Sequence, residues 1–127
     1  MTTATALCIS LLCVCICATG QTDGAAIIAC NPKAISAADR PRYSALAKRV
    51  RAAMRDRSEV SNGYVFRLES KLVSLPDAAE WIGMERMCCP FLTLQLSASG
   101  NQTDWVLTLT GPAGVKSLLD AEFPVSG

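Results

Sequence analysis

The sequence contains no histidine among its 127 residues. Histidine is the side chain that most often acts as a general base or a metal ligand near neutral pH. Its absence excludes a Ser-His-Asp triad, a Cys-His dyad and a histidine-based zinc site within this chain. Any reactive or ligand-binding site must therefore be built from other groups, and sulfur is the best placed of these.

The chain also lacks an excess of either charge. Lys and Arg number 12 and Asp and Glu 11, so the net charge is +1 and no overall field favours nucleic acid or an anionic membrane. One segment is locally basic, with the cations Arg40, Arg42, Lys48, Arg49, Arg51, Arg55 and Arg57. A basic helix can bind phosphates, but few aromatics and no reading motif accompany this one. We predict a solvated face, or one paired with the acidic C-terminal half, and no nucleic-acid partner.

Cysteine is plentiful but unevenly placed. Of the 7 cysteines, one group lies in an apolar N-terminal stretch and consists of Cys8, Cys13, Cys15 and Cys17. The remainder, Cys30, Cys88 and Cys89, belong to the body of the chain. An odd, uneven set is not typical of a disulfide scaffold, and no two of these residues form a Cys-x-x-Cys motif.

Residues 1–20 form an apolar segment that resembles a signal peptide or a membrane-associated stretch. Its uncharged part, residues 4–19, is shorter than the roughly 20 residues of a bilayer span. Small residues at Ala18 and Gly20 would permit cleavage before Gln21, but no Lys or Arg precedes the apolar run. Two alternatives follow: a periplasmic or membrane-associated protein, or a cytoplasmic one with an atypical start. We assign residues 21–127 to a single domain.

The first half of that domain predicts a strand, a helix and a second strand. The run Ala25–Cys30 is typical of a short buried strand that Asn31-Pro32 would stop. The amphipathic period predicts a helix from about Arg40 to Arg57. Ser61-Asn62-Gly63 is typical of a turn, and the alternation that follows predicts a strand over 64–68.

The second half predicts a helix, a hairpin and a final helix. Ser74 is a typical N-cap with Asp77 as its partner, and Pro90 forbids the helix to continue. Alternating leucines predict hairpin strands over 92–96 and 105–109, before a helix over 115–123. The order β-α-β-α-β-β-α predicts an α+β fold of two layers, with helices on one face of a largely antiparallel sheet.

The adjacent residues Cys88 and Cys89 form the strongest candidate site. Side chains of neighbouring helical residues diverge by about 100°, but Pro90 favours an exit of Cys89 from the helix, which would bring the sulfurs closer. Vicinal thiols chelate soft ions such as Hg(II), As(III), Cu(I) or Zn(II). Cys30, at the end of its predicted strand, is the expected third ligand.

Glu85 lies one helical turn before the pair. It can supply an oxygen ligand or accept a thiol proton, or its charge can raise the pKa of a thiol. A helix C-terminus also disfavours a thiolate, which argues against an activated nucleophile. A metal ion overcomes that penalty because it deprotonates its own thiols. The predicted metal site is thus Cys30, Cys88, Cys89 and Glu85, with no catalytic residue; the alternative is that the cysteines only pack.

Four stretches of the sequence resemble a family of small, largely uncharacterised bacterial proteins, over about residues 25–123. These stretches are Ile28–Asn31, Tyr64–Leu68, the run Glu85-Arg86-Met87-Cys88-Cys89-Pro90-Phe91, and Gly111-Pro112-Ala113-Gly114. The resemblance implies an association with heavy-metal or arsenic resistance. Similar chains begin near Ile27, so the N-terminal segment departs from the pattern and leaves the localisation open.

Three hypotheses follow from the sequence. The first is a soft-metal-binding protein for sequestration, delivery or detoxification, whose partner is a thiophilic ion of undetermined identity. The second is a thiol redox protein that cycles Cys88 or Cys89 with Cys30. The third is a structural or interaction domain with packed cysteines. None of the three requires an enzyme.

Overall fold

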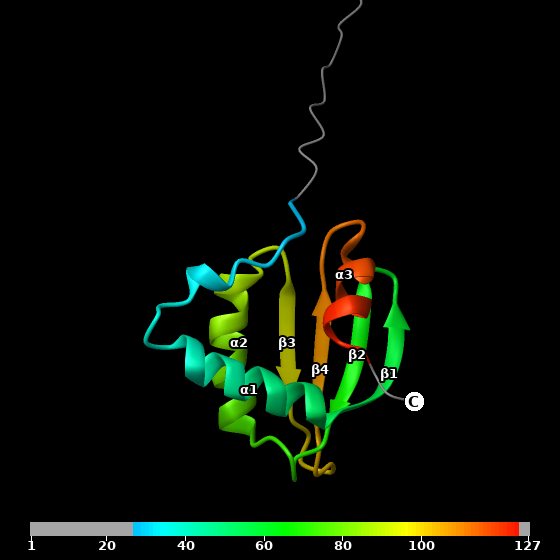
Figure 1. Ribbon diagram of the computed structural model, residues 1–127. Coiled ribbons are helices and arrows are strands. Elements are labelled where there is room, and N and C mark those ends of the chain that lie inside the picture. Colours follow the sequence, from blue (N-terminus) through cyan, green and yellow to red (C-terminus); the bar gives the residue numbers. More distant parts are fainter. Residues whose placement is uncertain (1–26, 125–127) are drawn as a thin grey trace, which may run out of the picture.

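The computed structural model describes residues 27–124 (Figure 1). Over these residues the chain forms a short 3-10 helix, three α-helices and four strands. Their bounds are η1 Pro32–Ala34, α1 Arg40–Ala53, β1 Met54–Val60, β2 Gly63–Leu68, α2 Leu75–Cys88, β3 Thr93–Ser97, β4 Trp105–Thr110 and α3 Val115–Glu122. The N-terminal segment 1–20 and the first residues of the predicted strand Ala25–Cys30 lie outside the described residues.

The strands form one sheet in the order β1-β2-β4-β3, and every neighbouring pair is antiparallel. The α+β class is confirmed, and from β2 onwards the elements follow the predicted order. The register places Leu68 opposite Trp105 at one end of the sheet. Thr93 lies opposite Thr110 at the other end, where α2 passes into β3.

One of the four strands, β1, does not lie where the sequence pattern placed a strand. Residues 27–31 belong to no strand, so that part of the expected strand Ala25–Cys30 is wrong. The expected helix to Arg57 is also wrong at its end, because α1 stops at Ala53 and Met54 begins β1. Met54 prolongs the amphipathic period of α1, yet it is buried opposite Leu68 on β2. Pairing with β2 outweighs the local helical preference of this polar edge strand.

One face of the sheet carries the core. The inward residues Phe66 and Leu68 of β2 and Leu107 and Leu109 of β4 are buried and alternate with partly exposed neighbours. Buried residues of all three helices join the same cluster. At its centre Trp81 of α2 meets Phe123, which follows α3, edge to face with ring centroids 6.2 Å apart. In Figure 1, α1 and α3 cross in front of the sheet.

The basic helix α1 is paired with acids from α2 and α3. Arg42 contacts Asp77 at 2.9 Å and Glu80 at 2.6 Å. Further pairs join α1 and β1 to α3, namely Arg51–Glu122 and Arg57–Asp120. These contacts confirm the predicted pairing with the C-terminal half. The cations of this face therefore link α1 and β1 to the acids of α2 and α3 while their side chains stay partly exposed.

None of the helices within residues 27–124 is long and apolar enough to cross a bilayer.

Candidate thiol site

The two adjacent cysteines end α2 as the sequence predicts. Ser74 caps the helix by accepting a hydrogen bond from the Asp77 amide at 3.2 Å. Cys88 is the last helical residue, and Cys89 leaves the helical region with φ −123° and ψ 72°. The Cys89 amide still donates to the Glu85 carbonyl at 2.8 Å. Because Pro90 has no N–H, the helical hydrogen bonds stop here, and the Cys89 sulfur lies within 4.8 Å of the Cys88 sulfur.

Cys30 reaches this helix end through the extended segment before η1. The Asn31 amide donates to the Cys88 carbonyl at 2.8 Å, which satisfies one of the orphan acceptors of a helix C-terminus. Figure 1 shows η1 beside the same end of α2. In this position Cys30 and Cys89 form a disulfide, with Cα atoms 4.6 Å apart and a separation of 59 residues in sequence. The predicted meeting of Cys30 with the pair is thus observed, without the predicted strand.

All three sulfur atoms lie within 4.8 Å of one another. At a metal–sulfur bond of about 2.3 Å, three thiolates in a plane around an ion stand about 4.0 Å apart. Because Cys30 and Cys89 are bonded to each other in the disulfide, the cluster can reach this size only after reduction lets their two sulfurs separate. Of these three cysteines Cys88 is the free thiol, and it is buried, as is Cys89, whereas Cys30 is partly exposed. Reduction of the disulfide would make all three sulfurs available as ligands.

Glu85 lies beside the sulfurs and is 4% exposed. The Tyr43 hydroxyl of α1 donates to its Oε2 at 2.7 Å, and its Oε1 lies 3.4 Å from Sγ of Cys89. In the disulfide Cys89 carries no proton, so the second distance is a contact; a reduced Cys89 thiol can donate there. Burial raises the pKa of Glu85, against the opposing effect of the Tyr43 hydrogen bond.

The electrostatics around Cys88 favour a neutral thiol. Burial raises the pKa of Cys88, and the charge of Glu85 acts in the same direction. Burial and the bond to Glu85 likewise raise the pKa of Tyr43 far above its ordinary value. A thiol in this setting is a weak nucleophile, because the thiolate is the reactive form. The arrangement suits an ion that binds sulfur strongly enough to displace the proton.

Two members of the site were not predicted. Tyr43 falls on the apolar face of the predicted helix, and a buried tyrosine hydroxyl usually needs a partner, which the sequence does not identify. Asn31 was read only as a strand stop. Their roles depend on the packing of α1 and of the N-terminal segment against α2. One further polar atom is buried nearby: the indole Nε1 of Trp81, which has no hydrogen-bond partner within residues 27–124.

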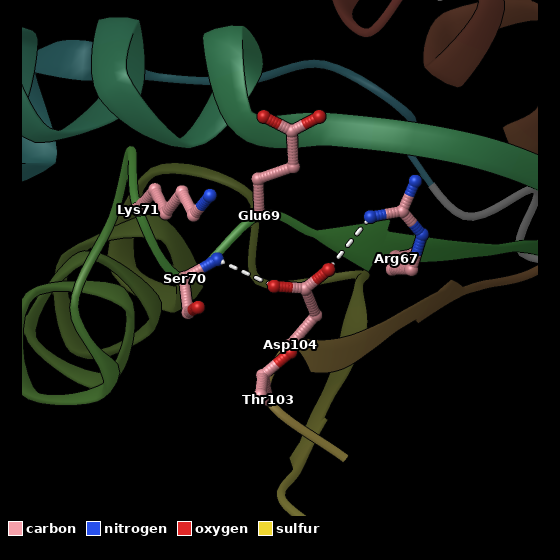
Figure 2. Close-up of a pocket in the computed structure, with 6 residues that line it drawn as sticks. All are labelled: Arg67, Glu69, Ser70, Lys71, Thr103 and Asp104. Carbon is pink, nitrogen blue, oxygen red and sulfur yellow. Dashed lines mark hydrogen bonds and ion pairs between the residues drawn. The ribbon is translucent and has the colours of Figure 1, made fainter.

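A separate cavity lies at the opposite end of the sheet (Figure 2). Its volume is about 630 Å³, and it is lined by Arg67, Glu69, Ser70, Lys71, Thr103 and Asp104. Asp104 accepts hydrogen bonds from the Arg67 guanidinium at 2.7 Å and the Ser70 amide at 2.9 Å. Arg67 also contacts Asp56, and Glu69 pairs with Arg55. Arg67, Glu69 and Asp104 are thus paired within the protein, and Lys71 is the charged lining residue for which the described residues show no ion pair.

No protein-family model, no curated protein and no solved structure matches this chain.

Proposed function

We propose that the reduced protein binds a soft, thiophilic metal ion through Cys30, Cys88 and Cys89, and that it sequesters or delivers that ion. The observation that carries this proposal is the meeting of three sulfurs within 4.8 Å of one another. The sulfurs come from two segments far apart in sequence, and reduction of the Cys30–Cys89 disulfide would free all three as thiolate ligands. The resemblance to proteins linked with heavy-metal or arsenic resistance agrees with a role in detoxification.

The donor set narrows the class of ion. Thiolates are soft ligands, and the site has no imidazole to attract borderline metals. Hg(II), As(III) and Cu(I) accept two or three sulfurs without a further ligand, whereas structural Zn(II) takes four. Glu85 is the nearest oxygen donor and would complete a zinc site. Replacement of Glu85 should therefore weaken Zn(II) binding and leave Hg(II) or As(III) binding nearly unchanged.

Metal stoichiometry tests the proposal. The full chain, with Cys8, Cys13, Cys15 and Cys17 changed to Ser, removes the thiols outside the described residues. In this background the reduced protein should bind one Hg(II) or As(III). The substitutions Cys30→Ser, Cys88→Ser and Cys89→Ser should each lower affinity by tenfold or more, about 1.4 kcal/mol.

Met87→Leu is the matched control. This neighbouring sulfur residue is exposed and points to solvent, so its loss should not change the affinity. Binding that is weak, non-stoichiometric and equal in all the cysteine variants would refute the metal site.

The disulfide itself favours a second candidate function, thiol redox exchange between Cys30 and Cys89. The two residues are already bonded, and the free thiol of Cys88 lies within reach. A redox titration followed by thiol counting distinguishes this role. A potential near that of cellular dithiols would support redox cycling, whereas a value below about −300 mV would mark a structural bond.

A further inference from the structure

The three sulfurs differ in accessibility to solvent, and the difference depends on the segment that carries each cysteine. Cys88 is 2% exposed and Cys89 fully buried, and both are held by α2. Cys30 is partly exposed and lies on residues 27–31, which belong to no helix or strand. The residues on either side of it, Ala29 and Asn31, are exposed, so this side of the cluster faces solvent. A reagent from solution meets Cys30 before it can meet the other two.

We propose that Cys30 is the entry sulfur, which takes the ion from a bulky thiolate carrier and passes it inward to Cys88 and Cys89. This inference rests on the proposed metal site and names its substrate: a soft ion delivered as a complex with small-molecule thiols, rather than as a free ion. Free soft ions are scarce wherever thiols are abundant, because thiolates bind them tightly.

The transfer is a series of ligand exchanges without any oxidation or reduction. In the first exchange the sulfur of Cys30 bonds to the ion and one carrier sulfur leaves, taking the proton that the Cys30 thiol gives up. In the second exchange a buried cysteine displaces the second carrier thiol in the same way. A third cysteine thiol can then add, and its proton goes to Glu85 or to solvent. The carrier never enters the buried part of the cluster.

The geometry of the segment supports the first exchange. The backbone bond from the Asn31 amide to the Cys88 carbonyl holds Cys30 over the end of α2. An ion bound to Cys30 therefore arrives within 4.8 Å of the next ligands. No large movement of α2 is required. Attack by a carrier complex on Cys88 or Cys89 directly would require the helix end to open, because these side chains are covered.

Stopped-flow absorbance of the sulfur-to-metal charge-transfer band tests the order of events. The full chain in the background described above is reduced and mixed with Hg(II) as its bis(glutathione) complex, or as its bis(2-mercaptoethanol) complex. The wild-type cluster should take Hg(II) from both carriers at similar rates. Cys30→Ser should slow the transfer from glutathione by about tenfold or more and the transfer from mercaptoethanol less, because exchange rates depend on access.

Cys88→Ser is the matched control, because it also removes one ligand but leaves the entry sulfur. It should lower the equilibrium affinity while the first transfer step keeps the wild-type rate. Equal rates for Cys30→Ser and Cys88→Ser with the glutathione complex would overturn the entry role and leave the metal site standing. Failure of the wild-type cluster to take Hg(II) from either carrier would overturn both. Cys30 lies outside the helices and strands, so circular dichroism should show an unchanged fold for Cys30→Ser.

Discussion

The two ends of the sheet differ in what they offer to a ligand. The end near Asp104 has a cavity, but most of its charged groups, all except Lys71, are already paired within the protein. The end near Cys88 has three sulfurs, one of them the buried free thiol of Cys88, and the buried carboxylate of Glu85. The cavity and the cluster of metal-binding side-chain types thus lie at different ends of this protein. A cavity whose charged side chains are mostly paired is a weaker candidate binding site than a packed cluster of soft donor atoms.

The largest expected effect concerns the disulfide at the thiol end. Closing a loop between residues 59 apart restricts the unfolded chain and should stabilise the protein by up to about 4 kcal/mol. We therefore expect the reduced protein to have a free energy of unfolding lower by that order, measured by urea denaturation with and without reductant. Cys30→Ser should show no further loss on reduction. An unchanged unfolding midpoint on reduction would show that the bond does not constrain the unfolded chain.

The next effect concerns Tyr43 and the buried carboxylate. Tyr43→Phe removes the hydroxyl that donates to Glu85 and leaves a buried acceptor without this partner. Such a loss costs about 1–3 kcal/mol. The double variant Tyr43→Phe with Glu85→Gln should recover part of the stability, because a neutral amide is cheaper to bury than a carboxylate. Equal stability of the wild type and Tyr43→Phe would show that water replaces the hydroxyl.

A pH series should separate the two ends, because their carboxylates shift in opposite directions. Burial raises the folded-state pKa of Glu85, so the folded protein binds this proton more tightly than the unfolded chain does. Its contribution to stability is greatest below the unfolded pKa and is lost as pH rises through the folded pKa. The wild type should therefore lose stability relative to Glu85→Gln as pH rises. A constant difference between the two proteins would contradict the shift.

Asp104 should behave in the opposite way. The Ser70 amide and the Arg67 guanidinium lower the pKa of Asp104. Its contribution is present above the unfolded pKa and is lost as pH falls through the folded pKa. The wild type should lose stability relative to Asp104→Asn in acid, in denaturation measured from pH 6 to about pH 2. The effect should be smaller than that at Glu85, because solvent screens this exposed pair.

The smallest expected effect is that of the cavity end on metal binding. Asp104→Asn changes the cavity but lies at the far end of the sheet from the sulfurs. It should leave Hg(II) affinity and transfer rates unchanged, whereas Cys88→Ser at the other end should lower the affinity. Competitive titration against a thiol chelator measures both. Loss of Hg(II) binding in Asp104→Asn would show that the two ends are coupled.

The elements that were predicted correctly carry strong local signals. Ser74 caps α2 because its side chain satisfies an amide of the first turn, and Pro90 ends the helix because it has no donor. The hairpin of β3 and β4 follows from alternating leucines. β1 carried no such signal. Its residues are mostly charged, and Met54 continues the pattern of the preceding helix, so only the pairing with β2 identifies it as a strand.

In the candidate site, too, some features follow from the sequence and others only from the tertiary structure. The sequence by itself determined that sulfur is the best-placed group for a reactive or ligand-binding site, since histidine is absent and Cys88 and Cys89 are adjacent at a helix end. It also suggested Cys30 and Glu85 as companions. Only the tertiary structure decided how they meet: a disulfide from Cys30 to Cys89, and a hydroxyl from Tyr43 on the carboxylate. The physical reason is that helix ends follow from local backbone chemistry, whereas contacts between distant segments depend on how the whole core packs.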